Sequence, residues 1–333
     1  MNCLRQNLPM LALLILPYIA FARKFSPAVE YAMARGAEAK FCLKVCDDAG
    51  LPVSNASARV LFDNLPCPHA VYGKTDANGI CVVEGKTNGN KINISVGKTG
   101  YYGSILETSL VPLGQEHDVD GGKWQPYPIE QMVSLKAIRT PVRLTSRHGV
   151  YYFPALKTWA AFDLVANDWV KPNGNGIVAD IEMFLDFEGE DPVNSKRQHF
   201  KIRFLNNASN GAYLASATKG SGCPFVLSAD EGKELGREFS DENECTWRKF
   251  GMLDKSVDMV FRIRSVTDAK GKLVSCYYGR LKRLDYGVER TGVGSIQMSW
   301  QYNPTPNDTN LEDVEIAKRS RAFIRQCEPP PTP

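Results

Sequence analysis

The chain lacks most of the features that mark common enzyme and membrane classes. After residue 22 it has no apolar run of the roughly 20 residues that a helix needs to cross a bilayer. It has only four histidines, and it has no Cys-x-x-Cys pair, Gly-x-Ser-x-Gly elbow, His-Glu-x-x-His motif or P-loop. These absences argue against a zinc site, a familiar serine hydrolase, a zinc protease and a nucleotide-binding enzyme. We therefore predict no cofactor and no metal.

The chain also lacks a large excess of either positive or negative charge. The formal net charge is +3 over 333 residues, and acidic and basic residues are interspersed. Such a balance is not the electrostatic pattern of a protein that binds nucleic acid or an anionic lipid surface. We predict no nucleic-acid partner.

The first 22 residues have the layout of a secretory signal peptide. Arg5 lies in a short polar start, an apolar stretch covers residues 10–16, and Ala20 and Ala22 supply the small residues that a signal peptidase needs. Pro17 and the following pair Arg23-Lys24 argue against a membrane anchor. We predict cleavage after Ala22, a secreted or periplasmic protein, and no membrane span after signal removal.

Cysteine usage agrees with export. Cys3 leaves with the signal, and eight cysteines remain, four in each half of the chain. An even number in each half predicts disulfides within each domain, although four cysteines allow three pairings. The candidate disulfide cysteines are Cys42, Cys46, Cys67, Cys81, Cys223, Cys245, Cys276 and Cys327.

Strand patterning dominates the mature chain. Apolar and polar residues alternate at residues 41–46, 177–188, 199–204 and 295–302, and glycine-containing turns separate such runs. We predict an all-β fold of two antiparallel β-sandwich domains in tandem with short terminal helices. The expected divisions are a signal peptide (1–22), an N-terminal segment (23–40), a first sandwich (41–140), a second sandwich (141–312), and a C-terminal helix with a proline-rich tail (313–333).

The first predicted sandwich carries a family resemblance. Its strand and turn residues are Val45, Asp47, Gly50, Pro52, Val53, Ala56, Arg59 and Val60, then Thr75-Asp76 and Asn78-Gly79, then Gly100-Tyr101. This pattern, over residues 42–112, resembles the carboxypeptidase-regulatory-like family of seven-stranded, transthyretin-like β-sandwiches. The resemblance implies an accessory or adhesive unit without catalytic residues of its own. Four cysteines and a longer connection at residues 65–72 depart from the family pattern.

The second half has a fainter resemblance. Asp168-Trp169-Val170, Pro172, Gly174 and Gly176, together with residues 303–312, are similar to a group of exported bacterial proteins of unknown function. This likeness implies a stable two-domain arrangement and no particular mechanism.

The acidic residues Asp180, Glu182, Asp186 and Glu188 are the most site-like feature. Paired carboxylates could serve glycoside hydrolysis or hold Ca²⁺. We favour a solvated strand face, paired with Lys201 and Arg203 across a hairpin. The Asn-rich loops 173–176 and 303–310 could offer oxygen ligands to calcium, but they lack the spacing of an EF-hand loop, and we favour tight turns. The tyrosine pairs at 101–102, 151–152 and 277–278 could each expose one ring to a sugar or a partner, but we favour an outer ring that covers the sheet edge.

The function that we predict is an exported, non-catalytic binding or structural module. The sequence does not identify the ligand, and the candidate partners are a glycan or a protein at the cell surface. The alternative is a carbohydrate-active hydrolase that uses carboxylates of the second domain. His69, His117, His148 and His199 have no recognisable serine or cysteine partner nearby in the sequence, which disfavours an enzyme without excluding one.

Overall fold

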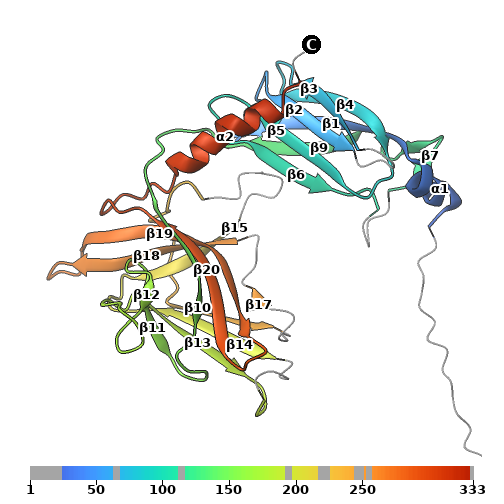
Figure 1. Cartoon of the computed structure of the whole chain (residues 1–333). Helices are drawn as coiled ribbons and strands as arrows, with labels where there is room; N and C mark the ends of the chain where they lie inside the picture. Colours follow the sequence, from blue (N-terminus) through green and yellow to red (C-terminus); the bar gives the residue numbers. More distant parts are fainter. Residues whose placement is uncertain are drawn as a thin grey trace, which may run out of the picture.

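The structure is a computed structural model that describes residues 25–62, 68–111, 117–191, 197–216, 226–243, 251–252 and 257–330. Within these ranges the chain forms two β-sandwich domains in tandem, with a helix near each end (Figure 1). Each domain has its own buried apolar core. The fold class predicted from the sequence is therefore confirmed. No helix in the described ranges has the length and apolar character needed to cross a bilayer.

In its described residues, the first sandwich has nine strands. They are β1 (Ala37–Asp47), β2 (Ser57–Phe62), β3 (His69–Lys74), β4 (Ile80–Thr87), β5 (Ile92–Gly97), β6 (Ser104–Thr108), β7 (Val119–Asp120), β8 (Lys123–Trp124) and β9 (Ile129–Leu135). One sheet has the order β4-β1-β8-β7, with β9 also pairing with β1, and the facing sheet has the order β3-β2-β5-β6. Apolar side chains of both sheets fill the space between them.

Strand β1 follows the predicted alternation. Phe41, Leu43 and Val45 are at most 2% exposed, while Cys42 and Cys46 are half-buried on the outer face. Its pairing with β9 is parallel, which differs from the purely antiparallel sheets that we expected. The strands between β1 and β9 provide the long connection that a parallel pair requires.

The second sandwich contains the remaining strands. They are β10 (Thr145–Tyr152), β11 (Ala160–Asp163), β12 (Asp168–Trp169), β13 (Ile181–Phe187), β14 (Gln198–Phe204), β15 (Gly211–Ser216), β16 (Glu238–Asn243), β17 (Gly251–Met252), β18 (Val257–Thr267), β19 (Leu273–Val288) and β20 (Gly294–Tyr302). One sheet has the order β10-β20-β19-β18-β15, with β17 beside β19, and the other has the order β12-β11-β13-β14-β16. The predicted hairpin of β13 with β14 is confirmed, with Glu182 opposite Arg203.

The two helices differ from the sequence prediction in detail. Helix α1 (Pro27–Arg35) begins after Ser26, whose hydroxyl accepts a hydrogen bond from Val29 N, and Gly36 at φ 77° ends it. Helix α2 (Val314–Gln326) is capped by Asp313, which accepts from Glu315 N at 2.9 Å. Asn310 lies before this cap, and its side chain donates to the Thr140 carbonyl at the domain junction.

Helix α2 follows the second sandwich in sequence but packs against the first (Figure 1). Ala317 of α2 and the ring of Tyr102 are both buried in a small apolar cluster, and Ile138 of the linker packs against it. The linker between the sandwiches, residues 136–144, contains Pro141, the predicted boundary. The C-terminal segment therefore ties the two domains together.

Candidate functional site at the domain junction

The acidic residues around β13 do not form one solvated row. Glu182 lies half-buried on β13 and accepts a hydrogen bond from Arg203 Nε at 2.7 Å, which confirms the predicted cross-strand pairing. Asp180 is fully buried, so its predicted solvent position is wrong. The reason is that β13 begins only at Ile181, and the loop before it departs from strand alternation. Ile177, predicted to face inward, is 81% exposed in that loop. The other two acids lie near cations: Asp186 is 3.5 Å from Lys157, and Glu188 is 3.7 Å from Arg197.

Asp180 belongs to a buried ion group with Asp163 and Arg264. Arg264 donates from Nε and Nη2 to the two carboxylate oxygens of Asp180, and Nη2 also donates to Asp163 Oδ1 at 2.6 Å. Arg264 has a φ of 53° and follows Ile263 at a shift in the pairing of β18 with β19. At this irregularity Arg264 reaches Asp180 and Asp163, whereas Arg262 donates to the Ser209 carbonyl.

Burial and hydrogen bonding oppose each other at these carboxyls. Burial raises the pKa of Asp180 by more than Arg264 lowers it. Burial also acts to raise the pKa of Asp163, but amide donors from Ala166, Val178 and Ile177, with Arg264, bring it below its usual value. Both side chains are at most 4% exposed. The group fixes the loop before β13 to β18 and leaves neither carboxylate open to a substrate.

Glu312 connects the first sandwich, the linker and the C-terminal segment. Its buried carboxylate accepts hydrogen bonds from the Tyr102 hydroxyl at 3.0 Å and from the backbone N–H groups of Arg139 at 2.7 Å and Thr140 at 2.8 Å. Asn310 Nδ2 donates to the Thr140 carbonyl at 2.7 Å. Three donors on one carboxylate hold the linker against both neighbours. We call Glu312, Tyr102 and residues 139–140 the junction clamp.

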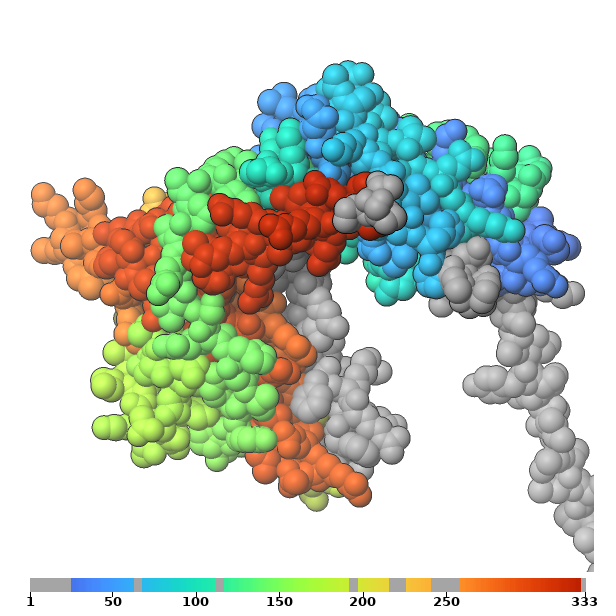
Figure 2. All heavy atoms as spheres, turned by 45° about the horizontal axis from the view of Figure 1, so that its top comes forward, coloured from blue at the N-terminus to red at the C-terminus, as the bar shows by residue number. Residues whose placement is uncertain are grey.

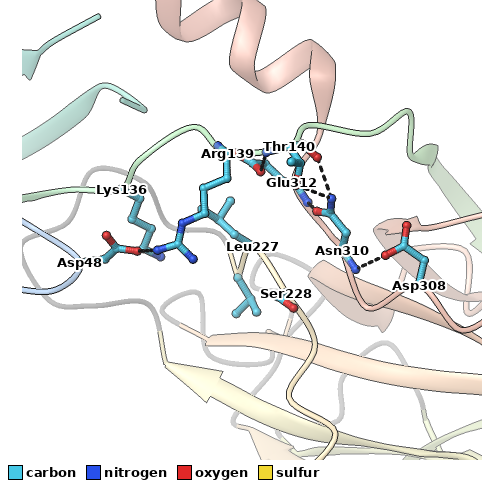
Figure 3. Close-up of a pocket in the computed structure, with 10 residues that line it drawn as sticks. Asp48, Lys136, Arg139, Thr140, Leu227, Ser228, Asp308, Asn310 and Glu312 are labelled. Atoms are coloured by element: carbon cyan, nitrogen blue, oxygen red, sulfur yellow. Dashed lines mark hydrogen bonds and ion pairs between the residues drawn. The ribbon is translucent and has the colours of Figure 1, made fainter. Parts of the chain in front are cut away.

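A cleft of about 550 Å³ opens beside the junction clamp. Figure 3 shows Arg139 reaching Asp48 on one side, with Asn310, Asp308 and Glu312 on the other. The lining comes from the turn after β1, the linker and two segments of the second domain. It comprises Asp48, Lys136, Arg139, Thr140, Val226, Leu227, Ser228, Asp308, Asn310 and Glu312. Donors, acceptors and apolar surface thus share one recess between the domains.

The charges around the cleft are partly compensated. Arg139 Nη2 donates to Asp48 Oδ2 at 2.6 Å, and the Arg139 side chain is 69% exposed. Below Val226, Asp258 Oδ2 accepts from the Val226 N–H at 3.0 Å. Burial raises the pKa of Asp258, against the lowering effect of nearby cations that include Lys136. A ligand in the cleft would meet hydrogen-bonding groups of both charge signs.

The predicted disulfides are not formed among the described cysteines. Cys42, Cys46, Cys81, Cys276 and Cys327 all have free thiols, while Cys67, Cys223 and Cys245 lie outside the described residues. Alternation provides the reason in the first sandwich, since Cys81 is buried whereas Cys42 and Cys46 lie on the outer face of β1. Cys276 belongs to an apolar cluster of the second domain, and Cys327 ends α2 near Gly97 of the first. A bridge that involves Cys67, Cys223 or Cys245 stays a prediction.

The histidines lie in separate parts of the structure. His69 stacks on Phe62 with ring centroids 5.4 Å apart, and His148 is exposed on β10. His117 Nδ1 lies 2.7 Å from the Gln125 carbonyl oxygen. In the described part of the chain, no three His, Cys, Asp or Glu side chains are arranged to hold a metal ion.

The asparagine-rich loops use their side chains within turns. Asp168 accepts from the N–H and Nδ2 of Asn175, and Asn303 Oδ1 accepts from Thr305 N at 2.9 Å. The bonds of Asp168 and Asn303 match the turn interpretation. Asn307 instead makes a long-range bond, since its Oδ1 accepts from Cys276 N at 3.0 Å.

Only one of the three tyrosine pairs has an exposed ring. Tyr152 is 55% exposed, while its neighbour Tyr151 packs near Trp300 and donates to Asn167. Tyr102 and Tyr278 are both buried, and their hydroxyls donate to glutamates. Tyr152 is therefore the one tyrosine of these pairs that offers most of its ring to a ligand.

Sequence reasoning missed the residues that build the junction. Glu312 appeared only within a loop motif, and neither Arg139 nor Lys136 was singled out. The local sequence held one signal, an acidic residue directly before the capped helix, but its partners lie far away in the chain. Tyr102 and Glu312 are 210 residues apart.

Comparison with known proteins yields only distant similarities. No protein family and no curated protein matches the sequence at a significant level. Among solved structures, 3-chlorocatechol 1,2-dioxygenase from Rhodococcus opacus 1CP and chlorocatechol 1,2-dioxygenase from Pseudomonas putida are 11% and 12% identical, each with a TM-score of 0.24. Each alignment covers 31% of this chain and 61% of the dioxygenase. Fervidolysin from Fervidobacterium pennivorans, a keratinolytic enzyme related to subtilisin, is 14% identical over 79% of this chain and 31% of its own, with a TM-score of 0.18. Similarities this distant indicate neither a fold family nor an activity.

Proposed function

We propose that this chain is an exported, non-catalytic binding module, and that the cleft at the domain junction takes a glycan. The observation that carries the proposal is the cleft itself, a recess of about 550 Å³ between two domains that the junction clamp holds together. Sites built between domains are common locations for ligands. The exposed Arg139, Thr140 and Ser228, with Asp308, match the alternating donors and acceptors of sugar hydroxyls.

The alternative function is a hydrolase that uses carboxylates of the second domain. Such an enzyme needs two carboxyl groups that flank an open substrate site. Asp180 is instead buried against Arg264, and Glu182 is bonded to Arg203. These contacts support the binding function over the hydrolase.

Export and family membership are part of the same proposal. Residues 1–24 and 63–67 lie outside the described ranges, so the signal peptide and the long connection with Cys67 keep their sequence-based support. The resemblance to carboxypeptidase-regulatory-like domains rests on the quoted strand and turn residues. It favours an accessory role for the first sandwich.

A glycan-array screen of the exported chain tests the binding function. A hit is then measured with Ser228→Trp, which fills the cleft from an exposed position, and with Thr158→Trp as an exposed control outside the cleft. We expect binding to be lost in the first variant and kept in the second. Equal binding by both variants would place the ligand elsewhere. Release of shortened products from a bound glycan, abolished in Glu182→Gln, would favour the hydrolase. Capture of a surface protein in place of any glycan would also overturn the glycan assignment.

A further inference from the structure

Helix α2 has an excess of three positive charges, which equals the formal net charge of the whole chain. Its 13 residues contain Lys318, Arg319, Arg321, Arg325 and a single acid, Glu315. The remaining chain has 36 basic and 36 acidic residues, since α2 takes four of the 40 bases and one of the 37 acids. The net charge of +3 therefore resides formally in this one helix. Basic and acidic residues are nearly equal in number over the whole chain, but basic residues are in excess in α2.

The cations of α2 share its outer side. Ala317 and Ser320 are buried, and Phe323 and Ile324 are half-buried, on the side that faces the first sandwich. Lys318, Arg319, Arg321 and Arg325 are exposed on the other side. Figure 2 shows α2, in red, lying open along the surface of the molecule.

Few acids neutralise this side of α2. Lys318 Nζ lies 2.7 Å from Glu315 Oε1. Arg319 also acts electrostatically on Glu315, but among the described residues no carboxylate lies within 4.0 Å of Arg319, Arg321 or Arg325. Arg143 of the linker is exposed and acts electrostatically on Glu315, so it extends the positive surface at the start of the helix. We call Arg143, Lys318, Arg319, Arg321 and Arg325 the basic face.

The basic face is held in place from both ends. At the start, Asp313 caps the helix and the junction clamp precedes it. At the end, Ile324 packs on Gly97, where a Cβ atom would lie 3.0 Å from Ile324 Cγ1. A fixed row of cations loses less conformational entropy on binding than cations on a mobile tail.

We propose that the basic face binds a linear acidic polysaccharide, a polymer with regularly spaced sulfate or carboxylate groups. From Lys318 to Arg325 the helix rises by about 10 Å, which spans more than one charged unit of such a chain. An amphipathic helix binds membranes by burying its apolar side in lipid. The apolar side of α2 is covered by the first sandwich, so a soluble polyanion fits the surface better than a bilayer. This proposal concerns a different surface from the glycan cleft and does not depend on it.

The test compares two variants with the same loss of charge. Arg319→Gln/Arg321→Gln/Arg325→Gln removes the unpaired cations of α2. Lys233→Gln/Lys270→Gln/Lys272→Gln removes three exposed cations from the second domain. Binding of the full exported chain to fluorescent heparin oligosaccharide and to polygalacturonate is measured at about 0.1 M salt, with neutral dextran as the negative probe.

We expect the α2 variant to bind heparin about 10- to 100-fold more weakly, the size expected for three lost charge contacts. The second-domain variant should bind within about twofold of the wild type, and all binding should weaken with added salt. Circular dichroism and the melting temperature should be alike in both variants because all six positions are exposed. Ser228→Trp should leave heparin binding unchanged, which separates this surface from the cleft.

Three outcomes would overturn the proposal. Equal weakening in both triple variants would indicate binding through overall charge. If the wild type did not bind heparin, the proposal that the basic face binds acidic polysaccharides would be wrong. Binding that depends on α2 but appears only with phosphatidylserine vesicles or with a DNA duplex would assign the basic face to a different polyanion.

Discussion

Gly103 lies directly under the ring of Phe323, so that a Cβ atom on this glycine would stand 2.0 Å from Cδ1 of the phenylalanine. Gly103 belongs to the first sandwich, just before β6, and Phe323 belongs to α2 at the far end of the sequence. The missing side chain lets the helix approach the sheet. The domain arrangement therefore depends on this contact.

Gly103→Ala should loosen α2 from the first sandwich. We expect a loss of about 1–3 kcal/mol in the free energy of unfolding, the usual cost of overpacking a tight contact. Limited proteolysis should cut α2 faster than in the wild type. Gly232→Ala is the control, because its nearest neighbour is the Asp230 side-chain oxygen at 3.3 Å. Adding Phe323→Leu to Gly103→Ala should restore part of the stability, and a failure of this rescue would contradict the steric explanation.

Glu312→Gln should weaken the junction clamp. The amide keeps one acceptor oxygen but loses the charge that all three donors share, and hydrogen bonds to charged groups contribute about 1.5–3 kcal/mol each. We expect small-angle X-ray scattering to show a larger radius of gyration than in the wild type. Tyr102→Phe removes one donor only and should have a smaller effect. An unchanged scattering profile with reduced stability would show that α2 alone holds the domains.

Asp180→Asn should destabilise the second domain more than Glu182→Gln. Asp180 is fully buried, and an amide in its place cannot accept from both Nε and Nη2 of Arg264, so one donor loses its partner at a cost of about 1–3 kcal/mol. Glu182 is half-buried beside a partly exposed Arg203, and such pairs are worth about 0–1 kcal/mol. Urea unfolding of both variants provides the comparison. Similar midpoints for the two would mean that the buried ion group does not form in solution.

The five described thiols should differ in reactivity. At pH 8 in native buffer, a maleimide reagent should label Cys42 and Cys46 first, because these two are half-exposed. Burial raises the pKa of the Cys81, Cys276 and Cys327 thiols, and their labelling should require denaturant. Peptide mapping without reduction locates each label. Failure of Cys42 and Cys46 to react before reduction would support the disulfides predicted from the sequence.

Alkaline pH should destabilise the chain through Cys327. Burial raises the pKa of this thiol from its ordinary value of 9.0 to about 12 in the folded protein. Between these two values the unfolded chain releases the proton and the folded chain retains it, so the free energy of unfolding falls as pH rises from 9 towards 12. Urea midpoints at pH 8 and pH 10 should differ less in Cys327→Ala than in the wild type. If the urea midpoint fell equally in the wild type and in Cys327→Ala, other groups would be responsible for the loss of stability at alkaline pH.

Cleavage of the exported protein should occur after Ala22. Ala20 and Ala22 provide the small-residue pattern, and Arg23-Lys24 ends the apolar run. Intact-mass analysis of protein recovered outside the cytoplasm decides the site. A chain that still begins at Met1 would argue against secretion and remove the reason for expecting disulfides.

The sequence by itself determined the fold class and much of its local structure. Strand alternation predicted which side chains of β1 are buried, because a half-buried strand has only two faces. The turns at Gly50 and Gly79 could be predicted because glycine tolerates positive φ. In the structure both glycines adopt it. The pairing of Glu182 with Arg203 followed from the hairpin. These features depend on contacts between residues close in sequence or on one periodic strand.

Only the tertiary structure decided where the long-range contacts lie. Asp180 sits one residue before a strand that begins at Ile181, and its burial depends on Arg264, which lies at a strand irregularity. Glu312 meets Tyr102 across 210 residues, and α2 returns to the domain from which it is most distant in sequence. The junction cleft and the basic face both result from this return. Residue spacing cannot report such contacts, because they are set by how two finished domains and a helix pack together.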